Sequence, residues 1–401
     1  MGGRQRIELI YIDSGGGHRA SALALQEEIL RQKRPWDVRL RGAQEIFDSI
    51  DAVRKLTGVP FQEIYNIMLR RGWTLGSELM IPAMHMCFRL MHERQVAALV
   101  NLWKHNPPDL VVSLIPHFNR AMHQALQIAC PGTPLVTVLT DFADFPPHFW
   151  IERQSQYIVC GTARAAAQAK QLGHPDSHIL RTSGMVLHPR FYDRPEIDIQ
   201  AEREKLGLKP DLPTGLVLFG GEGSMAAVRI VRALNRAALP MQLIVLCGRQ
   251  KQAAAEIRSM AKNMPVFVEG FTREVPHYMR LSDFFIGKPG PGCISEALAL
   301  GLPVVVESNA WTLAQERYNA EWVIEQGVGI VIKDFAHMDE AVRRLLSRDT
   351  FDRYRSNVAK VQNFALYKVL SIIEALLERQ PIGGTMTPVS KDIPSTAHQA
   401  V

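Results

Sequence analysis

The 401-residue chain lacks the features that mark secreted, membrane-spanning or metal-binding proteins. No stretch approaches the roughly 18–20 uninterrupted apolar residues that a transmembrane helix needs. The first apolar run begins at Ile7 and leads straight into a glycine turn, which is not the pattern of a secretory signal. The five cysteines are scattered and form no C-x-x-C pair, so neither a zinc site nor a disulfide framework is indicated. We expect a cytoplasmic protein with reduced cysteines in its core.

Charge and motif content disfavour a nucleic-acid-binding protein and a nicotinamide-dependent dehydrogenase. The net charge of +6 is instead compatible with binding to an anionic membrane surface. No basic stretch is interleaved with aromatic residues as in single-strand binders, so we expect no nucleic-acid partner. Neither glycine-rich turn of the chain spells G-x-G-x-x-G, which disfavours a nicotinamide-dependent dehydrogenase.

Two glycine-rich turns, about 270 residues apart, are the most informative features of the sequence. Residues 13–18 follow the apolar run 7–12, and residues 288–293 follow the run 283–287. Each reads as strand, turn and helix, an arrangement that aims backbone N–H groups at an anion. Two such turns in a chain of this length predict a ligand held between two α/β domains.

Short apolar runs alternate with helix-like segments in both halves, which predicts parallel, doubly wound sheets. We expect strands at residues 7–12, 109–115, 134–139, 157–160, 215–219, 242–247, 266–269, 283–286 and 303–307. A segment rich in Pro, Asp and Arg, residues 185–211, predicts an interdomain linker. We therefore expect an N-terminal domain over residues 1–190, a C-terminal domain over 191–379 and a disordered tail over 380–401.

Residues 58–94 interrupt the alternation, because apolar residues, many of them methionine, crowd a segment dotted with Arg70, Arg71 and Arg89. Two interpretations stay open: a helical excursion folded onto the domain core, or a partly exposed surface that touches a membrane or a lipid substrate. Methionine-rich surfaces adapt to irregular apolar ligands, which favours the second. It predicts peripheral association with the inner face of the cell membrane.

The second half carries a series of polar turns at the ends of its expected strands, where ligands bind in open α/β sheets. The turns are residues 220–224, 247–249, 270–272 and 288–293. Glu296, about one helical turn beyond Gly292, is placed to accept two hydrogen bonds from a ribose diol. Gln315 and Glu316 follow the last expected strand and suit recognition of sugar hydroxyls.

In the first half, His18 is the candidate catalytic base. It follows three glycines at the start of a helix, where the dipole lowers the pKa of an imidazole. Asp141 follows another strand end and is placed to orient or assist the base, and His148 to contact phosphate or acceptor. Asp141 and Asp144 lack a matching acid or histidine cluster, so we expect no metal.

With these motifs the sequence resembles the family of monogalactosyldiacylglycerol synthases and processive diacylglycerol glucosyltransferases. The resemblance spans residues 7–332 and rests on SGGGHRASA at 14–22, TD at 140–141 with HFW at 148–150, GGEGS at 220–224, KPGPG at 288–292 with SEA at 295–297, GLP at 301–303, and QE at 315–316 with Asn319. The chain departs from the family pattern at Pro289 and at residues 309–313, so donor sugar and acceptor class stay open. A more distant likeness is to the peptidoglycan N-acetylglucosaminyltransferase that makes lipid II.

The resemblance implies a GT-B fold, in which two Rossmann-like domains face a central cleft, with a UDP-sugar donor, inversion at the anomeric carbon and no metal cofactor. It places Phe271 near uracil, Glu296 on the ribose and His18 toward the acceptor. The expected donor contacts are Gly17, Gly221, Gly223, Ser224, Arg249, Phe271, Thr272, Gly290, Pro291, Gly292, Glu296, Gln315 and Glu316.

The leading hypothesis is an inverting glycosyltransferase that moves a hexose from a UDP-sugar to the hydroxyl of a lipid such as diacylglycerol at a membrane surface. One alternative is a nucleotide-sugar epimerase on the same fold, which would convert UDP-N-acetylglucosamine without an acceptor. Another is a lipid-associated binding protein without activity. The apolar segment 58–94 argues against the first alternative, and the retention of His18, Asp141 and Glu296 against the second.

Overall fold

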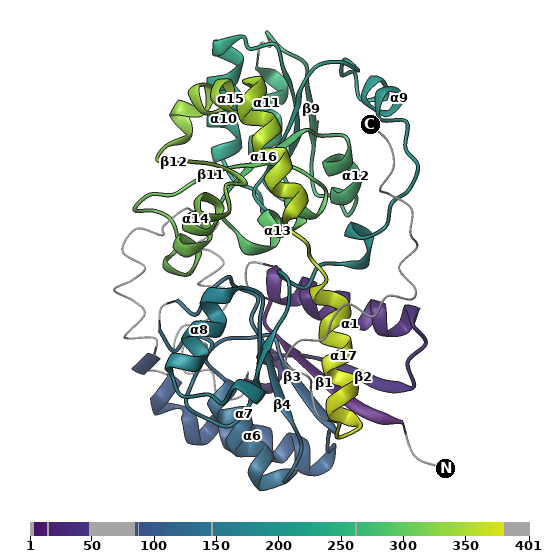
Figure 1. The fold of residues 1–401 in the computed structure, drawn as a ribbon, viewed down its shortest axis with the longest axis vertical. Coiled ribbons are helices and arrows are strands. Elements are labelled where there is room, and N and C mark those ends of the chain that lie inside the picture. The colour runs from purple at the N-terminus through teal and green to yellow at the C-terminus, as the bar shows by residue number, and fades with distance from the viewer. Residues whose placement is uncertain are drawn as a thin grey trace.

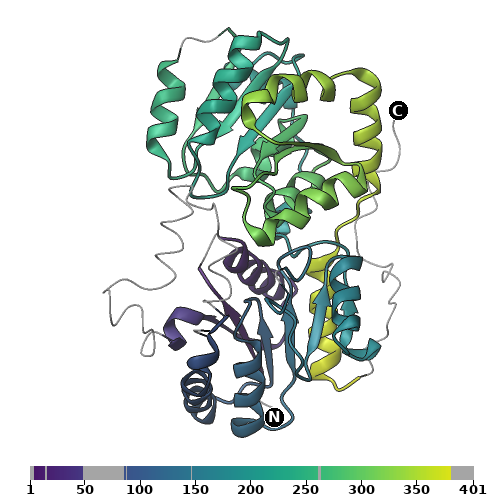
Figure 2. The ribbon, with the colours of Figure 1, turned by 90° about the vertical axis from the view of Figure 1, so that its left-hand side faces the viewer.

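The structure is a computed structural model that describes residues 4–13, 16–47, 85–86, 88–145, 147–260 and 263–380. The expectations for Ser14, Gly15, residues 58–84 and the tail 381–401 lie outside the described residues. Two lobes are stacked along the long axis of the molecule, each built on one sheet with helices on both faces (Figures 1 and 2). The two doubly wound sheets agree with the sequence-based expectation.

Each sheet has six strands, and every pairing between them is parallel. The first has the order β2-β1-β3-β4-β5-β6 and the second β12-β11-β10-β7-β8-β9. The strands of the first sheet are β1 (Gln5–Tyr11), β2 (Trp36–Gly42), β3 (Leu110–Ser113), β4 (Leu135–Val138), β5 (Tyr157–Cys160) and β6 (Ile179–Arg181). Those of the second are β7 (Thr214–Leu218), β8 (Gln242–Leu246), β9 (Val266–Glu269), β10 (Phe284–Gly287), β11 (Val304–Glu307) and β12 (Gly329–Ile332).

Helices cover both faces of each sheet, which buries the central strands on two sides. Every residue of β3, β4, β7, β8 and β10 is buried. The described helices are α1 (Gly17–Arg31), α2 (Ala43–Phe47), α6 (His92–His105), α7 (Asn119–Ala129), α8 (Ala163–Gln171), α9 (Ile199–Lys205), α10 (Ala226–Ala237), α11 (Lys251–Ser259), α12 (Val275–Arg280), α13 (Pro291–Ala299), α14 (Ala314–Gln326), α15 (Met338–Leu345), α16 (Arg348–Lys360) and α17 (Ala365–Leu377). Among the described helices, none is long and apolar enough to cross a membrane.

The last helix corrects the expected domain boundary. Leu366, Val369 and Ile373 of α17 are buried in the same cluster as Leu25 of α1 and Leu110 of β3. The chain therefore returns to the first lobe at its C-terminal end, where α17 lies beside α1 (Figure 1). The expected second domain, residues 191–379, is therefore wrong at its C-terminal end, because the sequence of an apolar helix does not show which sheet the helix covers.

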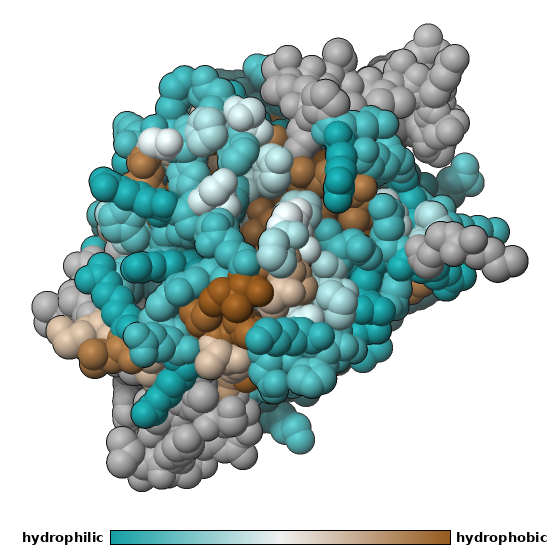
Figure 3. Space-filling view, turned by 90° about the horizontal axis from the view of Figure 1, so that it is seen from below, coloured by the Kyte–Doolittle hydropathy of each residue, from teal (hydrophilic) through white to brown (hydrophobic). Residues whose placement is uncertain are grey.

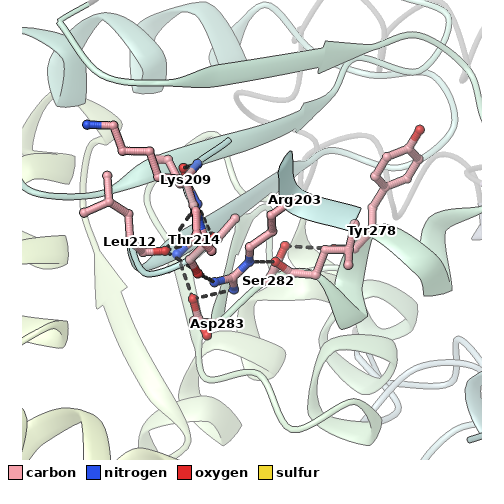
Figure 4. A network of polar contacts seen from close by, with 10 residues as sticks. Arg203, Lys209, Leu212, Thr214, Tyr278, Ser282 and Asp283 are labelled. Carbon is pink, nitrogen blue, oxygen red and sulfur yellow. Dashed lines mark hydrogen bonds and ion pairs between the residues drawn. The ribbon is translucent and has the colours of Figure 1, made fainter. Parts of the chain in front are cut away.

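A buried polar network fixes the linker helix α9 to the second sheet (Figure 4). The Arg203 side chain, 9% exposed, donates to the Asp283 carboxylate at 2.9 Å and to the Leu281 carbonyl at 2.9 Å. Asp283 also accepts from the Thr214 N–H at 2.8 Å, at the first residue of β7. One guanidinium thus joins the linker to the starts of β7 and β10.

We expect Arg203→Ala to lower the free energy of unfolding by about 3 kcal/mol, because it leaves a carboxylate and a carbonyl without their buried donor. The matched control is Arg232→Ala, which removes an exposed pair with Glu256 and changes stability by less than about 1 kcal/mol. Thermal unfolding of both variants checks the difference. Equal shifts in the two midpoints would contradict the assignment of Arg203 to the fold.

Candidate active site

His18 lies in the first turn of α1, which begins directly after Gly16 at φ 84°. Its Nδ1 is 2.9 Å from the Thr140 hydroxyl, and its ring centroid is 5.6 Å from that of Trp150. Desolvation by burial lowers the pKa of His18 to about 4, against the smaller effect of a hydrogen bond to the Leu114 backbone. The direction of this shift agrees with the expectation from the sequence, but its cause is burial rather than the helix dipole. The imidazole is therefore neutral at pH 7.

Asp141 follows Thr140 in the loop after β4, and its side chain bonds to Trp150. Its Oδ2 accepts from the Trp150 indole N–H at 2.8 Å. Burial raises the pKa of Asp141 to about 7; Glu316 raises it further, whereas Lys288 opposes the shift. The charges that act on Asp141 thus include two of the second lobe. The side chain within hydrogen-bond distance of the His18 imidazole is that of Thr140 and not that of Asp141.

Asp144 and His148 shape the same loop. The Asp144 carboxylate accepts from the N–H of His148 at 3.0 Å and from the N–H of Trp150 at 2.6 Å. Asp144 therefore holds the loop backbone. His148 is exposed, has a φ of 64°, and its Nδ1 is 3.4 Å from the Ile151 carbonyl.

The two lobes meet at this loop. The rings of Phe142 and Trp322 on α14 have centroids 4.6 Å apart. Close by in the second lobe, Lys288 Nζ is 2.7 Å from Glu316 Oε1, an ion pair in which the Glu316 side chain is 10% exposed. This pair was not predicted from the sequence, although Lys288 lies in the glycine turn.

Two of the glycine turns in the second lobe pack directly against each other. The Arg249 N–H donates to the Gly221 carbonyl at 3.0 Å. Gly223 has a φ of 73°, and a Cβ there would lie 1.9 Å from the Cys247 carbonyl oxygen. The turns at 220–224 and 247–249 therefore form one compact backbone unit, in which Ser224 Oγ accepts from the Ala226 N–H at 3.1 Å.

Phe271 covers this unit from the next strand end. Its ring is 53% exposed and lies 4.9 Å from the Arg249 guanidinium. The guanidinium also pairs with Glu222 at 2.7 Å. Thr272 Oγ1 accepts from the Glu274 N–H at 3.0 Å and so fixes the turn that presents Phe271. An exposed aromatic face above glycine backbone is suited to stacking a planar base.

The turn after β10 leaves open space at the start of α13. Gly290 caps the helix without a side-chain hydrogen bond, and Pro291 occupies its first position. A Cβ on Gly292 would meet nothing within 4 Å. The free N–H groups of this first turn and the helix dipole favour an anion there. Asn319 fixes the turn by donating to the Pro289 carbonyl at 2.9 Å.

Glu296 lies one turn further along α13. Burial alone raises its pKa to about 7. A half-buried carboxylate with this shift gains when a ligand brings hydrogen-bond donors to it. Gln315 and Glu316 lie in the first turn of α14, and Glu316 accepts a hydrogen bond from Lys288 of the turn 288–290.

The site residues predicted from sequence thus fall into two groups, one per lobe. His18, Thr140 and Asp141 form the group of the first lobe. The Lys288–Glu316 pair belongs to the second group, and its charges act on the pKa of Asp141. Gly17 opens α1 next to His18. Within the described ranges, no group of three or more His, Cys, Asp or Glu residues is placed to hold a metal ion.

We expect Gly223→Ala to destabilise the second lobe by at least about 2 kcal/mol, since an alanine there requires both a left-handed backbone and displacement of the Cys247 carbonyl. Gly292→Ala is the matched control, because its Cβ enters open space in a helix and leaves the unfolding midpoint unchanged or higher. Thermal unfolding without ligand distinguishes them. A stable Gly223→Ala protein would overturn the packing described for this turn.

Comparison with known proteins places these features in a family. Residues 216–370 match the glycosyltransferase family 28 C-terminal domain. The chain is 30% identical to the probable monogalactosyldiacylglycerol synthase 2, chloroplastic, of Oryza sativa subsp. japonica, over 96% of this chain and 83% of the relative. MurG of Acinetobacter baumannii superimposes with a TM-score of 0.57 at 13% identity, over 92% of this chain and 99% of that one. A putative UDP-N-acetylglucosamine 2-epimerase from Listeria monocytogenes gives 0.58 at 15% identity, over 94% and 98%.

The structural likenesses confirm the GT-B fold, with two Rossmann-like domains facing each other. They say nothing of the reaction, because the same fold carries both transferases and epimerases at this level of identity. The sequence likeness goes further, since it extends over both lobes. The chain belongs to the monogalactosyldiacylglycerol synthase family of glycosyltransferases.

Proposed function

We propose that the protein transfers a hexose from a UDP-sugar to the hydroxyl of a lipid acceptor such as diacylglycerol, with inversion at the anomeric carbon. The observation that carries the proposal is the neutral His18 beside Thr140, whose neighbour Asp141 has a pKa that responds to Glu316 and Lys288 of the second lobe. Membership of the family supports the same reaction class.

The second lobe offers a set of contacts for each part of a UDP-sugar. Phe271 stacks on uracil, and the Glu296 carboxylate, once ionised, accepts from the ribose hydroxyls. The N–H groups at the start of α13 hold the pyrophosphate in the open space beside Gly292. Gln315 and Glu316 contact the hexose, with Lys288 holding the Glu316 carboxylate in place.

The transfer step follows from the protonation state of His18. We assign the ring N–H to Nδ1, which lies 2.9 Å from the Thr140 hydroxyl, so that Nε2 keeps a lone pair. That nitrogen takes the proton of the acceptor hydroxyl as its oxygen bonds to the anomeric carbon. The bond from that carbon to the UDP oxygen breaks, and UDP leaves with the electron pair. Backbone N–H groups and the α13 dipole stabilise the departing charge without a metal.

Asp141 acts on the second lobe in this proposal. Its pKa of about 7 leaves it partly protonated at neutral pH, so it faces Glu316 with less repulsion than a full charge would cause. The Trp150 indole holds it in this position. Asp141 thus positions the hexose-binding side of the cleft, and His148 at the loop tip remains available to the acceptor.

We also propose that the acceptor reaches the first lobe from an anionic membrane surface on the cytoplasmic side. Two large apolar side chains near α6, Met86 and Leu90, are 62% and 80% exposed. The end of the molecule formed by the first lobe is mostly hydrophilic, with a few compact apolar areas (Figure 3). Apolar side chains on such a surface support shallow, reversible lipid contact.

A donor panel scored by UDP release, with and without lipid extract, tests the proposal. We expect release only when a UDP-hexose and lipid are both present, and a glycolipid product. Conversion of UDP-N-acetylglucosamine without an acceptor would instead identify an epimerase. No release with any donor, while UDP still binds, would identify a binding protein without activity.

A further inference from the structure

A pocket of about 510 Å³ lies between the two lobes, apart from the residues assigned to transfer. Its walls are the ends of β5 and β6 in the first lobe and parts of α13, α14 and α16 in the second. Phe142, the residue after Asp141, lines it, whereas His18, Asp141, Glu296 and Glu316 do not. The pocket is therefore a neighbour of the transfer site and has its own lining.

The charges of this pocket, which we call the hinge pocket, are mainly positive. Arg164 and Arg181 come from the first lobe and Lys360 from α16 of the second. The one carboxylate among its lining residues is Glu325, which accepts from the Tyr318 hydroxyl at 3.2 Å. The Arg164 guanidinium lies 5.6 Å from the centroid of the Tyr318 ring, so this cation is already held across the two lobes.

The start of α8 adds backbone donors to the same wall. The Thr162 side chain caps the helix by accepting from the Ala165 N–H at 3.2 Å. Ala163 and Arg164 precede that N–H, so their own N–H groups have no acceptor within the helix. Both residues line the hinge pocket. The positive end of the helix dipole thus coincides with the basic side chains.

Hydrogen bonds at the floor of the pocket join the two segments where the chain passes from one lobe to the other, residues 183–185 and 363–364. Asn363 Nδ2 donates to the Met185 carbonyl at 3.0 Å, and the Phe364 N–H donates to Ser183 Oγ at 2.9 Å. Gly184 has a φ of 85°, and a Cβ there would lie 2.9 Å from Asn363 Nδ2. The walls come from separate lobes, while this floor is common to both.

We propose that the hinge pocket binds a phosphate-bearing anion that is contacted by both lobes. Two guanidinium groups, an ammonium group and the N–H groups of a helix start are the donors that phosphate oxygens use in proteins. The volume exceeds that of a lone ion and fits a phosphate ester with an organic part. A free phosphate ester and a phospholipid head group share this chemistry.

Calorimetric titration with glycerol 3-phosphate tests the proposal, with saturating UDP present so that the donor turns are occupied. We expect binding to the full-length protein, weakened at least threefold by Arg181→Gln alone and by Lys360→Gln alone, and at least tenfold by the double variant. Both side chains are exposed, so the fold should tolerate these changes, and thermal unfolding checks this. The matched control is Arg348→Gln at the other end of α16, which should bind as wild type does.

Flotation with vesicles distinguishes the two sources of the anion. A phospholipid source predicts that the double variant binds phosphatidylglycerol vesicles less than wild type, with equal binding to phosphatidylcholine vesicles. The proposal is overturned if the double variant matches wild type in both the titration and the flotation, or if Arg348→Gln weakens binding as much. Neither measurement uses turnover, so each holds whatever sugar or acceptor the enzyme takes.

Discussion

Replacing His18 with alanine should lower turnover by roughly 10²–10⁴-fold while UDP affinity stays nearly unchanged. The reason is the division of labour between the lobes. His18 belongs to the first lobe, where we propose that its lone pair meets the acceptor hydroxyl, and all the expected donor contacts except Gly17 lie in the second. Turnover measured as UDP release in the presence of lipid, beside calorimetry with UDP, separates the two effects.

Thr140→Val is the matched control for this variant. It removes the hydroxyl 2.9 Å from His18 Nδ1 but keeps the imidazole, so we expect a loss of turnover of about tenfold or less.

The pH profile of turnover gives a further check. Because the pKa of His18 is about 4, the base is unprotonated from pH 5 upward, and turnover should not fall near pH 6.5 through protonation of this residue. Wild-type turnover in His18→Ala, or a loss of UDP affinity as large as the loss of turnover, would refute the assignment.

Replacing Glu296 with glutamine should weaken UDP binding by roughly 10- to 100-fold, since an ionised carboxylate accepting from two hydroxyls is lost. The pKa of about 7 makes the effect depend on pH. Ribose hydroxyls donate to the ionised form, so below pH 7 the carboxyl must release a proton before UDP binds. Affinity therefore rises with pH and levels off above about pH 7.

The glutamine variant supplies its own control for the pH dependence. The terminal phosphate of UDP also titrates, with a pKa near 6, and contributes equally in both proteins. The difference in UDP affinity between wild type and Glu296→Gln isolates the carboxyl, and it should shrink as pH falls from 8 to 5. A difference that is constant over this range would show that Glu296 does not titrate with the ligand.

Sequence patterns predicted the buried strands well, because apolar runs between helices need no context to be recognised. They missed β2, whose Asp37, Arg39 and Arg41 make it look like a loop. In the structure β2 is the edge of the first sheet, and Arg41 lies 3.4 Å from the buried Glu8 of β1. A charged segment of this kind forms a strand because it pairs with a neighbouring strand, and that pairing cannot be read from the local sequence.

The candidate site could be predicted in its residue types but not in its connections. Glycine turns at strand ends predicted the donor side, and a histidine after glycines predicted the base. The Thr140 hydroxyl beside His18 depends on how α1 packs against the loop after β4, and the effect of Lys288 and Glu316 on the pKa of Asp141 depends on how the two lobes meet. Such contacts join residues more than 120 positions apart, and no local pattern encodes them.

The return of α17 to the first lobe has a consequence for the order in which the protein matures. Leu25 and Ile29 of α1 share a core with Leu366 and Ile373, near the end of the described chain. On the ribosome, the first lobe is synthesised early but waits with an uncovered apolar face until the last helix emerges. The second lobe, whose sheet is complete by Ile332, can close before it. The half of the molecule that is made first is thus finished last, and it needs protection from aggregation during translation.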